Sequence, residues 1–319
     1  MRFIPLAAML LSACLALPAV AASDAQDWLR RLTEASQHQS YQGTFVYERN
    51  GSFSTHSIWH QVGKDSVVRD RLLRLDGAAY EAFRVNGRTE CVDGTLADQA
   101  TDAQGWPARD LDAAELAKWY DIRVMGESRI AGRSAIVLGL LPRDQHRYGV
   151  ELYLDRETGV PLKSLLLNDK GQMLERFQFT QFVANQAAAD ADALQPSADC
   201  KPVTAVESSP LDAKAWRSDW LPPGFVLSST SQRVSPITHE PVGSLLYDDG
   251  LARFSVFLEP LDGATAEDAR TQLGPTVAVS RRLATASGDV MVTVVGEIPL
   301  GTAERVALSV RQGEAQPQP

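Results

Sequence analysis

Short turns divide the first half of the chain and constrain its fold more than any other feature. They separate runs rich in β-branched and aromatic residues, and their residue types tolerate positive φ at tight turns. The turns are Asn50-Gly51, Asp76-Gly77, Asn86-Gly87, Ala131-Gly132, Thr158-Gly159 and Asp169-Lys170-Gly171. Connections this short force neighbouring strands to be antiparallel. The sequence therefore predicts a long antiparallel meander.

Two helices accompany this meander. Ser23 and Gln26 form a capping box that predicts a helix start, and a second helix is expected around residues 112–120. The predicted strands are the hairpin Tyr41 to His60, then Ser66 to Leu75, Ala79 to Asn86, Asp121 to Ile130, Ser134 to Leu141, Tyr148 to Asp155, Pro161 to Leu167 and Met173 to Phe182. So many strands must either close into a barrel or curl around something that covers their inner face.

The last third of the chain mixes strands and helices. Thr265 with Asp268 suggests a capping box for a helix that ends before Gly274. The segment 303–310 fits either a strand or one helical face, and Pro299 and Thr302 favour a helix start. Strands are predicted at Phe225 to Gln232, Ser244 to Asp248, Ala252 to Glu259, Thr276 to Leu283 and Asp289 to Val295.

The chain divides into five segments. Its 319 residues exceed what one core usually holds, and periodicity stops in a stretch rich in Ala, Asp, Ser, Pro and Gln. We expect a signal peptide at 1–21, a β domain at 22–184, a linker at 185–215, a smaller α/β domain with an antiparallel sheet at 216–311 and a disordered tail at 312–319. The fold class is thus mostly β, of the α+β type.

The first residues predict export. Arg2 precedes an apolar run, and Ala19-Val20-Ala21 places small residues where a signal peptidase needs them. A lipobox ending at Cys14 is the alternative, in which that cysteine would be acylated. The run is short for a membrane span and no second candidate follows. We therefore expect a soluble periplasmic protein.

The net charge and the cysteine content limit the kinds of partner and the covalent links that the chain can have. Without Arg2 the chain holds 30 basic and 40 acidic residues, a net charge of −10, which disfavours nucleic acid as a partner. Cys91 and Cys200 remain in an oxidising compartment. They either form a disulfide, which would tie the first half to the linker, or stay as two buried thiols.

Catalytic and metal-binding motifs are missing from the sequence. No nucleophile elbow, zinc-binding helix, P-loop or dinucleotide fingerprint occurs, so neither an enzyme nor a cofactor is expected. His56 and His60 lack an obvious third metal ligand, and we interpret them as polar strand positions. His146 lies beside Asp144 in a segment interpreted as a turn leading into a strand. The Asp248-Asp249 pair is typical of a loop.

Binding surfaces are more credible than catalytic sites. Strand aromatics and leucines could line a concave face for lipid, although each is more typical of an ordinary core. Clustered arginines could hold lipid phosphates or form a solvated face. The lipid-binding candidates are Trp59, Phe83, Phe177 and Phe179 with Arg69 and Arg71, and Phe182, Leu165, Leu167 and Arg74 extend the same patterns. The candidates for binding a protein partner are Trp216, Arg217, Trp220 and Phe225, and the alternative is that the tryptophans only anchor the adjoining linker.

Six blocks of the sequence carry a family resemblance: Tyr41 to His60 (YQGTFVYERNGSFSTHSIWH), Asp144 to Tyr148 (DQHRY), Leu162 to Phe182, Trp216 to Phe225 (WRSDWLPPGF), Asp249 to Pro260 and Val294 to Arg305. These blocks resemble the RseB/MucB family of periplasmic regulators of envelope stress. The resemblance implies that the first domain is an unclosed, strongly curved β-barrel like that of bacterial lipoprotein carriers, with helices on its concave side.

The resemblance also implies a function. Family members bind the periplasmic segment of a transmembrane anti-sigma factor and shield it from proteolysis until a lipid, lipoprotein or lipopolysaccharide releases them. The sequence of these blocks is most similar to the MucB branch of the family, which implies control of alginate synthesis. We expect the second domain to make most of the partner contact, and a homodimer is left open. The alternative is a periplasmic lipid or lipoprotein carrier without an anti-sigma partner.

Overall fold

The computed structural model describes residues 17–94, 111–184, 194–203, 209, 211, 215–235, 239–261, 267–286 and 288–313. The side chains of residues 17–23 are not described. The predicted signal peptide up to residue 16, the Cys14 lipobox, most of the predicted linker and residues 314–319 of the predicted tail lie outside these ranges. Within them, no helix combines the length and the apolar character that a membrane crossing requires.

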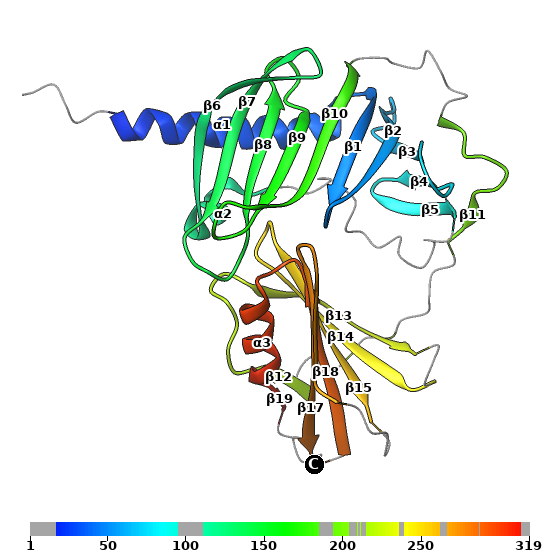
Figure 1. Cartoon of the computed structure of the whole chain (residues 1–319), viewed down its shortest axis with the longest axis vertical. Coiled ribbons are helices and arrows are strands. Elements are labelled where there is room, and N and C mark those ends of the chain that lie inside the picture. The colour runs from blue at the N-terminus through cyan, green and yellow to red at the C-terminus, as the bar shows by residue number, and fades with distance from the viewer. Residues whose placement is uncertain are drawn as a thin grey trace, which may run out of the picture.

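An eleven-stranded antiparallel sheet forms the first domain (Figure 1). Its spatial order is β11-β5-β4-β3-β2-β1-β10-β9-β8-β7-β6, so β11 and β6 are edges and the barrel stays open. The strands are β1 Tyr41–Arg49, β2 Ser52–Val62, β3 Val68–Arg74, β4 Glu81–Val85, β5 Arg88–Asp93, β6 Tyr120–Ile130, β7 Arg133–Pro142, β8 Gly149–Asp155, β9 Pro161–Leu167, β10 Met173–Ala184 and β11 Lys201–Pro202. The predicted curved, unclosed antiparallel barrel is confirmed.

The turns adopt the conformations that their residues favour. Asn50 and Gly51 both have positive φ, of 52° and 72°, and Asn86 and Gly87 repeat the pattern with 49° and 77°. Two successive residues with positive φ match the right-handed twist of the strands that they join. The hairpin register follows, since Arg49 pairs with Ser52 and Val85 with Arg88.

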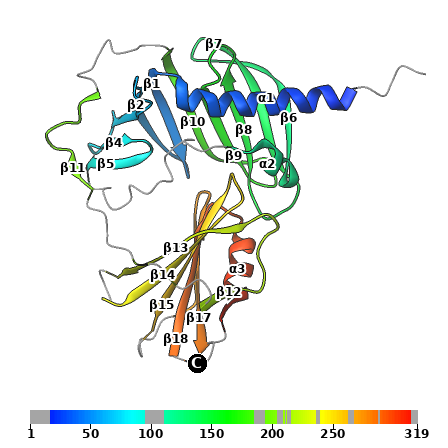
Figure 2. The ribbon, with the colours of Figure 1, turned by 180° about the vertical axis from the view of Figure 1, so that it is seen from behind.

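Helix α1 (Leu17–His38) crosses the strands β6 to β10 on one face of the sheet, as Figure 2 shows from behind. Its buried residues Ala25, Leu29 and Leu32 join a core with Leu138 and Leu152 of the sheet. The predicted start at Ser23 is wrong, because the helix continues upstream through Val20 and three alanines, and alanine is the strongest helix former.

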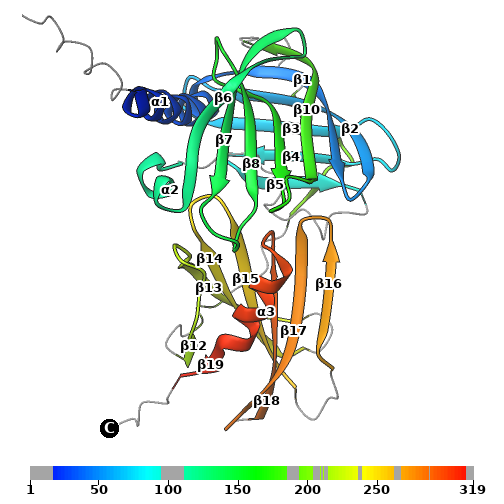
Figure 3. The same cartoon turned by 60° about the vertical axis from the view of Figure 1, so that its left-hand side comes forward.

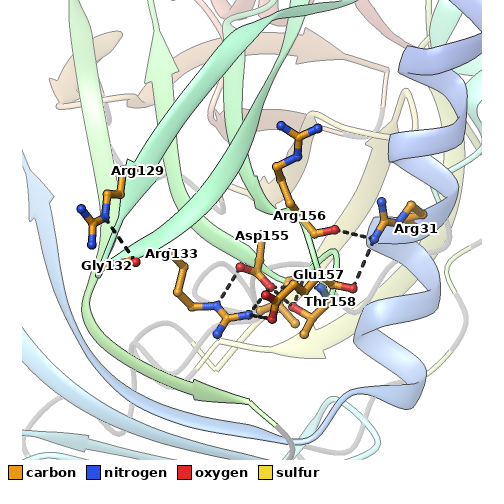
Figure 4. A network of polar contacts seen from close by, with 9 residues as sticks. Arg31, Arg129, Gly132, Arg133, Asp155, Arg156, Glu157 and Thr158 are labelled. Carbon is orange, nitrogen blue, oxygen red and sulfur yellow. Dashed lines mark hydrogen bonds and ion pairs between the residues drawn. The ribbon is translucent and has the colours of Figure 1, made fainter.

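A polar network fastens α1 to the turn between β8 and β9 (Figure 4). Arg31 donates to the carbonyl oxygens of Arg156 and Glu157 at 2.8 and 3.2 Å. Beside it, Arg133 donates to both carboxylate oxygens of buried Asp155, at 2.7 and 2.9 Å. Asp155 also accepts from the amide and the hydroxyl of Thr158, which closes the turn. This contact fixes the helix along the sheet.

Aromatic rings fill the inner face where β1 meets β10. Phe179 and Phe182 both point inward despite their odd spacing, because a bulge shifts the register opposite Thr44 and Phe45. Gly43 leaves room for these rings, since a Cβ there would lie 2.7 Å from the Phe179 ring. His56 and His60 stack on Phe45 and Tyr41 at ring-centroid distances of 5.1 and 4.7 Å.

A disulfide joins Cys91 of β5 to Cys200, with their Cα atoms 5.4 Å apart. The bridge brings the two-residue strand β11 against β5, where Lys201 pairs with Val92. Glu81 accepts the amide of Ser197 at 3.1 Å, which holds the same segment from its other end. Of the two alternatives left open by the sequence, the structure contains the bridge.

The second domain is a six-stranded antiparallel sheet with the order β13-β14-β15-β18-β17-β16 (Figure 1). Its strands are β13 Val226–Val234, β14 Pro241–Asp248, β15 Arg253–Pro260, β16 Ala269–Leu273, β17 Thr276–Thr285 and β18 Gly288–Gly296. Helix α3 (Leu300–Ser309) packs its Ala303 and Val306 into the core, which confirms a helix in the ambiguous segment. Two short strands, β12 Trp216–Ser218 and β19 Val310–Gln312, pair beside it.

The predicted helix before Gly274 is wrong. Strand β16 occupies the segment and forms a hairpin with β17 across Gly274, whose φ is +60°. Asp268 accepts the amide of Arg282 on the partner strand at 2.8 Å, so its carboxylate does not complete a capping box. The local helix signal therefore yields to strand pairing.

Candidate regulatory site at the domain junction

A buried ion pair connects the two domains. Arg147, in the loop between β7 and β8, donates to Asp249 at 2.5 Å, and both side chains are 0% exposed. The guanidinium also bonds to Asp144 at 2.9 Å and to the carbonyl oxygen of Pro223. Figure 3 shows this loop projecting from the large sheet toward the second domain. Each of the two domains therefore supplies one partner of a fully desolvated charge pair.

Asp249 is positioned by the turn between β14 and β15. Its Oδ1 accepts the amides of Leu251 and Ala252 at 2.9 and 2.7 Å, which closes the turn. Its Oδ2 is left to face Arg147 and the hydroxyl of Tyr120, which donates at 2.9 Å. One oxygen thus shapes the loop while the other bridges the domains.

Aromatic rings exclude water from the ion pair. The Arg147 guanidinium lies 5.1 Å from the ring centroid of Phe225, 5.4 Å from that of Tyr120 and 5.7 Å from that of Trp119. Helix α2 (Ala113–Trp119), capped by Asp112, delivers two of these rings at its end. Burial, and then the charge of Asp249, raises the pKa of Tyr120, so its hydroxyl stays a donor. Cations over ring faces gain most where water is absent.

A second contact lies on the same loop. The hydroxyl of Tyr148 donates to the carbonyl oxygen of Ile298 at 3.1 Å, and the Nδ1 of His146 lies 3.2 Å from the hydroxyl of Thr302. The ring of Trp220 meets His146 edge-on at 5.2 Å and carries Arg305 above it at 3.9 Å. The loop therefore contacts both the start of α3 and the segment before β13.

A third contact involves the β1–β2 hairpin. Arg49, at the end of β1, reaches Glu297 at 2.9 Å and also contacts the hydroxyl of Thr276. Within its own domain Arg49 lies 3.4 Å from Glu175 of β10. Tyr47 donates to the same Glu175 at 2.7 Å. One arginine thus lies between two carboxylates, one from each domain.

Gly224 permits the close approach of the domains. Its φ is +87°, and a Cβ built on it would lie 2.4 Å from two atoms of the Trp119 indole. We expect Gly224→Ala to weaken the junction by about 1–3 kcal/mol, since it adds both backbone strain and overpacking. Faster hydrogen exchange in residues 144–148 would report the weakening. Gly171→Ala is the control, because that glycine has a φ of +71° but an open surrounding. Equal effects of both changes on residues 144–148 would contradict the prediction.

Comparison with known proteins places this arrangement in a family. The MucB/RseB N-terminal domain model matches residues 24–198, and the MucB/RseB C-terminal domain model matches residues 210–311. The chain belongs to the MucB/RseB family. The sigma factor AlgU regulatory protein MucB of Pseudomonas aeruginosa is 62% identical over 95% of this chain and 96% of its own length. The sigma-E factor regulatory protein RseB of Escherichia coli K12 is 32% identical over 90% of this chain and 91% of its own.

Solved structures of MucB resemble this family member to different extents. The Pseudomonas aeruginosa MucA/MucB complex matches with a TM-score of 0.81 at 63% identity, covering 92% of this chain and 100% of that one. A crystal structure of MucB matches with a TM-score of 0.69 at 60% identity, covering 91% and 98%. The two MucB structures have nearly the same sequence identity to this chain and cover nearly the same share of it. The difference between their TM-scores therefore reflects how well their backbones superpose on this chain.

The predicted partner-binding residues of this MucB/RseB chain lie at or near the junction. Trp220 and Phe225 contact the first domain through His146 and Arg147, and Trp216 packs against the core of the second domain. Arg217 is exposed and pairs with Asp219 at 3.1 Å. The structure thus brings together the loop and the aromatic segment, while their role toward a partner stays a prediction.

The predicted lipid-binding residues divide between the two faces of the sheet. Phe177 and Phe179 belong to the inner aromatic core. On the opposite face Trp59, Arg71 and Phe83 form one row, because strand register pairs Trp59 with Arg71 and Arg71 with Phe83. Arg69, two residues before Arg71 on β3, lies on the same outward face. Arg71 forms an ion pair with buried Glu81 at 2.8 Å. No single site contains all six residues, and their role toward lipid stays a prediction.

Sequence reasoning missed the residues that join the domains. Arg147 and Asp249 were interpreted as parts of a turn and a loop, and this interpretation is incomplete because both carboxylate and guanidinium are fully buried. One signal was present: Arg147 and Asp249 both lie in blocks that resemble the family, Asp144 to Tyr148 and Asp249 to Pro260. In the described part of the chain, no group of three or more His, Cys, Asp or Glu side chains could hold a metal ion.

Proposed function

We propose that this protein binds the periplasmic segment of a transmembrane anti-sigma factor, protects it from regulated proteolysis and so restrains an envelope-stress sigma factor. The observation that carries the proposal is the match, at a TM-score of 0.81, to MucB as it occurs in the MucA/MucB complex. A second structure, of MucB with the periplasmic part of MucA, matches at 0.80. The 62% identity to a regulator of AlgU supports alginate control as the outcome, and the proposed role is binding rather than catalysis.

We further propose that an amphiphile, as lipid, lipoprotein or lipopolysaccharide, releases the partner. The outward row of Trp59, Arg71 and Phe83 supports this step, because it lies beside Arg69, a cation that is 36% exposed and could meet a phosphate, whereas Arg71 is held by Glu81. The Arg71 guanidinium lies 5.7 Å from the ring centroid of Trp59. By linkage, the amphiphile must bind the released form more tightly than the partner-bound form.

Calorimetric titration tests both steps. The chain should bind the purified periplasmic segment of the anti-sigma factor with micromolar or tighter affinity, and added lipopolysaccharide or lipopeptide should weaken that binding. Trp59→Ala should reduce the weakening, whereas Arg123→Ala, at an exposed position of β6, should not. Lipid binding without partner binding would instead make the protein a carrier.

The proposed partner surface lies mainly in the second domain. Deleting the chain after Ala215 should therefore abolish binding of the anti-sigma segment in the same titration. Arg217, the exposed member of the predicted set, offers a milder variant, since Arg217→Ala removes a side chain that is 57% exposed. Full binding by the truncated chain would move the partner site to the first domain.

A further inference from the structure

One cluster of ionisable groups at the junction is not used by the proposed function. Glu175 of β10 and Glu297, which follows β18, lie on either side of Arg49. Both carboxylates are largely covered, with side chains 22% and 35% exposed, and Arg49 is 24% exposed. The Arg49 guanidinium is therefore the shared ion-pair partner of two carboxylates, one from each domain.

The surroundings of Glu175 leave its charge poorly balanced. From β1, the Tyr47 hydroxyl donates to it and Arg49 approaches it. From β9, its strand partner is Leu166, which brings no charge. From the second domain, Glu297 adds a negative charge and Thr276 adds only a hydroxyl, which contacts Arg49. The neighbouring Arg176 cannot help, because it pairs with Glu48 at 2.7 Å.

The electrostatic consequence is visible at two side chains. Burial, and then the charge of Glu297, raises the pKa of Glu175 from 4.5 to about 7, against the opposing effects of Tyr47 and Arg49. The field of Glu297 also reaches Tyr148, where burial, Glu297 and Asp169 raise the pKa to about 12. The Glu297 charge comes from the other domain.

We propose that Glu175, Arg49 and Glu297 form a proton-dependent latch that closes the two domains against each other when Glu175 takes up a proton. With Glu175 neutral, Arg49 is free to pair with Glu297 across the junction. With Glu175 ionised, the closed junction holds two carboxylates against one guanidinium. The latch differs from the Arg147–Asp249 pair, whose two side chains are fully buried. It is a property of the two domains and needs no partner.

The direction of the pH effect follows from linkage. Because closure raises the pKa of Glu175, the closed form binds the proton more tightly than the open form does. Closure is therefore favoured as the pH falls through the raised value. Lowering the pH from about 8 to about 6 should therefore increase the closed population. Opening releases the proton.

Distances between spin labels on the chain from Ala22 onward, which lacks Cys14, test the latch. Cysteines introduced for Arg88 and Leu308, which are exposed positions of the two domains, would carry the labels while Cys91 and Cys200 stay bridged. Electron–electron resonance should show the closed population rising as the pH falls from 8 to 6. Glu175→Gln should remain closed at both pH values, and Glu297→Gln should move the transition to lower pH.

A matched control separates the latch from general charge effects. Glu127→Gln removes a carboxylate that is 66% exposed and pairs with Arg156, so it should keep the wild-type pH response. If Glu175→Gln perturbs folding, the shift in Glu297→Gln decides the question alone. A wild-type distance distribution that is unchanged between pH 8 and 6, or one that changes equally in Glu175→Gln, would overturn the proposal. Neither result bears on binding of the anti-sigma factor.

Discussion

Replacing Arg147 by methionine should destabilise the native arrangement more than any other single change at the junction. The substitution leaves Asp249 buried without its cation, and removing one partner of a buried pair costs about 3–5 kcal/mol. Tyr120 would still donate to Asp249, and Oδ1 would still hold its turn, so the second domain should stay folded. We therefore expect the two domains to unfold in separate steps, which differential scanning calorimetry would resolve.

Two companion variants sharpen this test. Arg123→Met removes an exposed arginine that lies 3.8 Å from Asp121, and surface pairs contribute at most about 1 kcal/mol, so one transition should remain. The double variant Arg147→Met with Asp249→Leu removes both charges, and it should recover part of the lost stability. A single unshifted transition in Arg147→Met would contradict the assignment of this pair as the main link between the domains.

Most strands of the first domain can be predicted from local sequence, because its turns are short and contain residue types, such as Asn-Gly, that favour positive φ. Asn50-Gly51 and Asn86-Gly87 take the positive φ values that their residues favour, and the hairpins follow from them. The sequence does not predict strand β5 even though its turn is recognisable, because Arg88–Asp93 shows little apolar alternation. The curvature came from the resemblance to a family, since no local pattern encodes how far a sheet bends.

The second domain shows where local signals fail. Thr265 and Asp268 match a capping box, yet β16 forms because its backbone pairs with β17 over five residue pairs. Intrinsic helix propensity contributes little free energy over so short a segment, and strand pairing can outweigh it. The ambiguous segment after Pro299 became a helix because Ala303, Val306 and Ala307 all reach the core.

The junction was the least predictable part of the molecule. Arg147 and Asp249 are 102 positions apart, and neither local segment shows that its charge will be buried. Sequence patterns report periodicity and turns, whereas burial of a polar loop depends on which surface docks against it. Trp220 and Phe225 illustrate the same limit, because an aromatic segment predicted to meet a partner also meets the other domain of its own chain.

Removing the Cys91–Cys200 bridge should produce the second large effect. The bridge spans 109 positions, and loop-closure models give a crosslink of that length roughly 4–5 kcal/mol of stability, mainly by restricting the unfolded chain. The double variant Cys91→Ser with Cys200→Ser should therefore unfold at a clearly lower denaturant concentration than the oxidised protein. Urea titrations followed by tryptophan fluorescence would measure the difference.

A reductant supplies the control for this prediction. The wild type in reductant should match the double variant, and the double variant itself should not respond to reductant. The loss should appear first around β11, because Lys201 and Pro202 are a two-residue edge pairing that the bridge holds against β5. Hydrogen exchange should therefore accelerate at Val203, whose amide donates to the carbonyl oxygen of Glu90 at 2.9 Å. Unchanged unfolding midpoints in reductant would show that the segment stays docked by its backbone bonds and the Glu81–Ser197 contact alone.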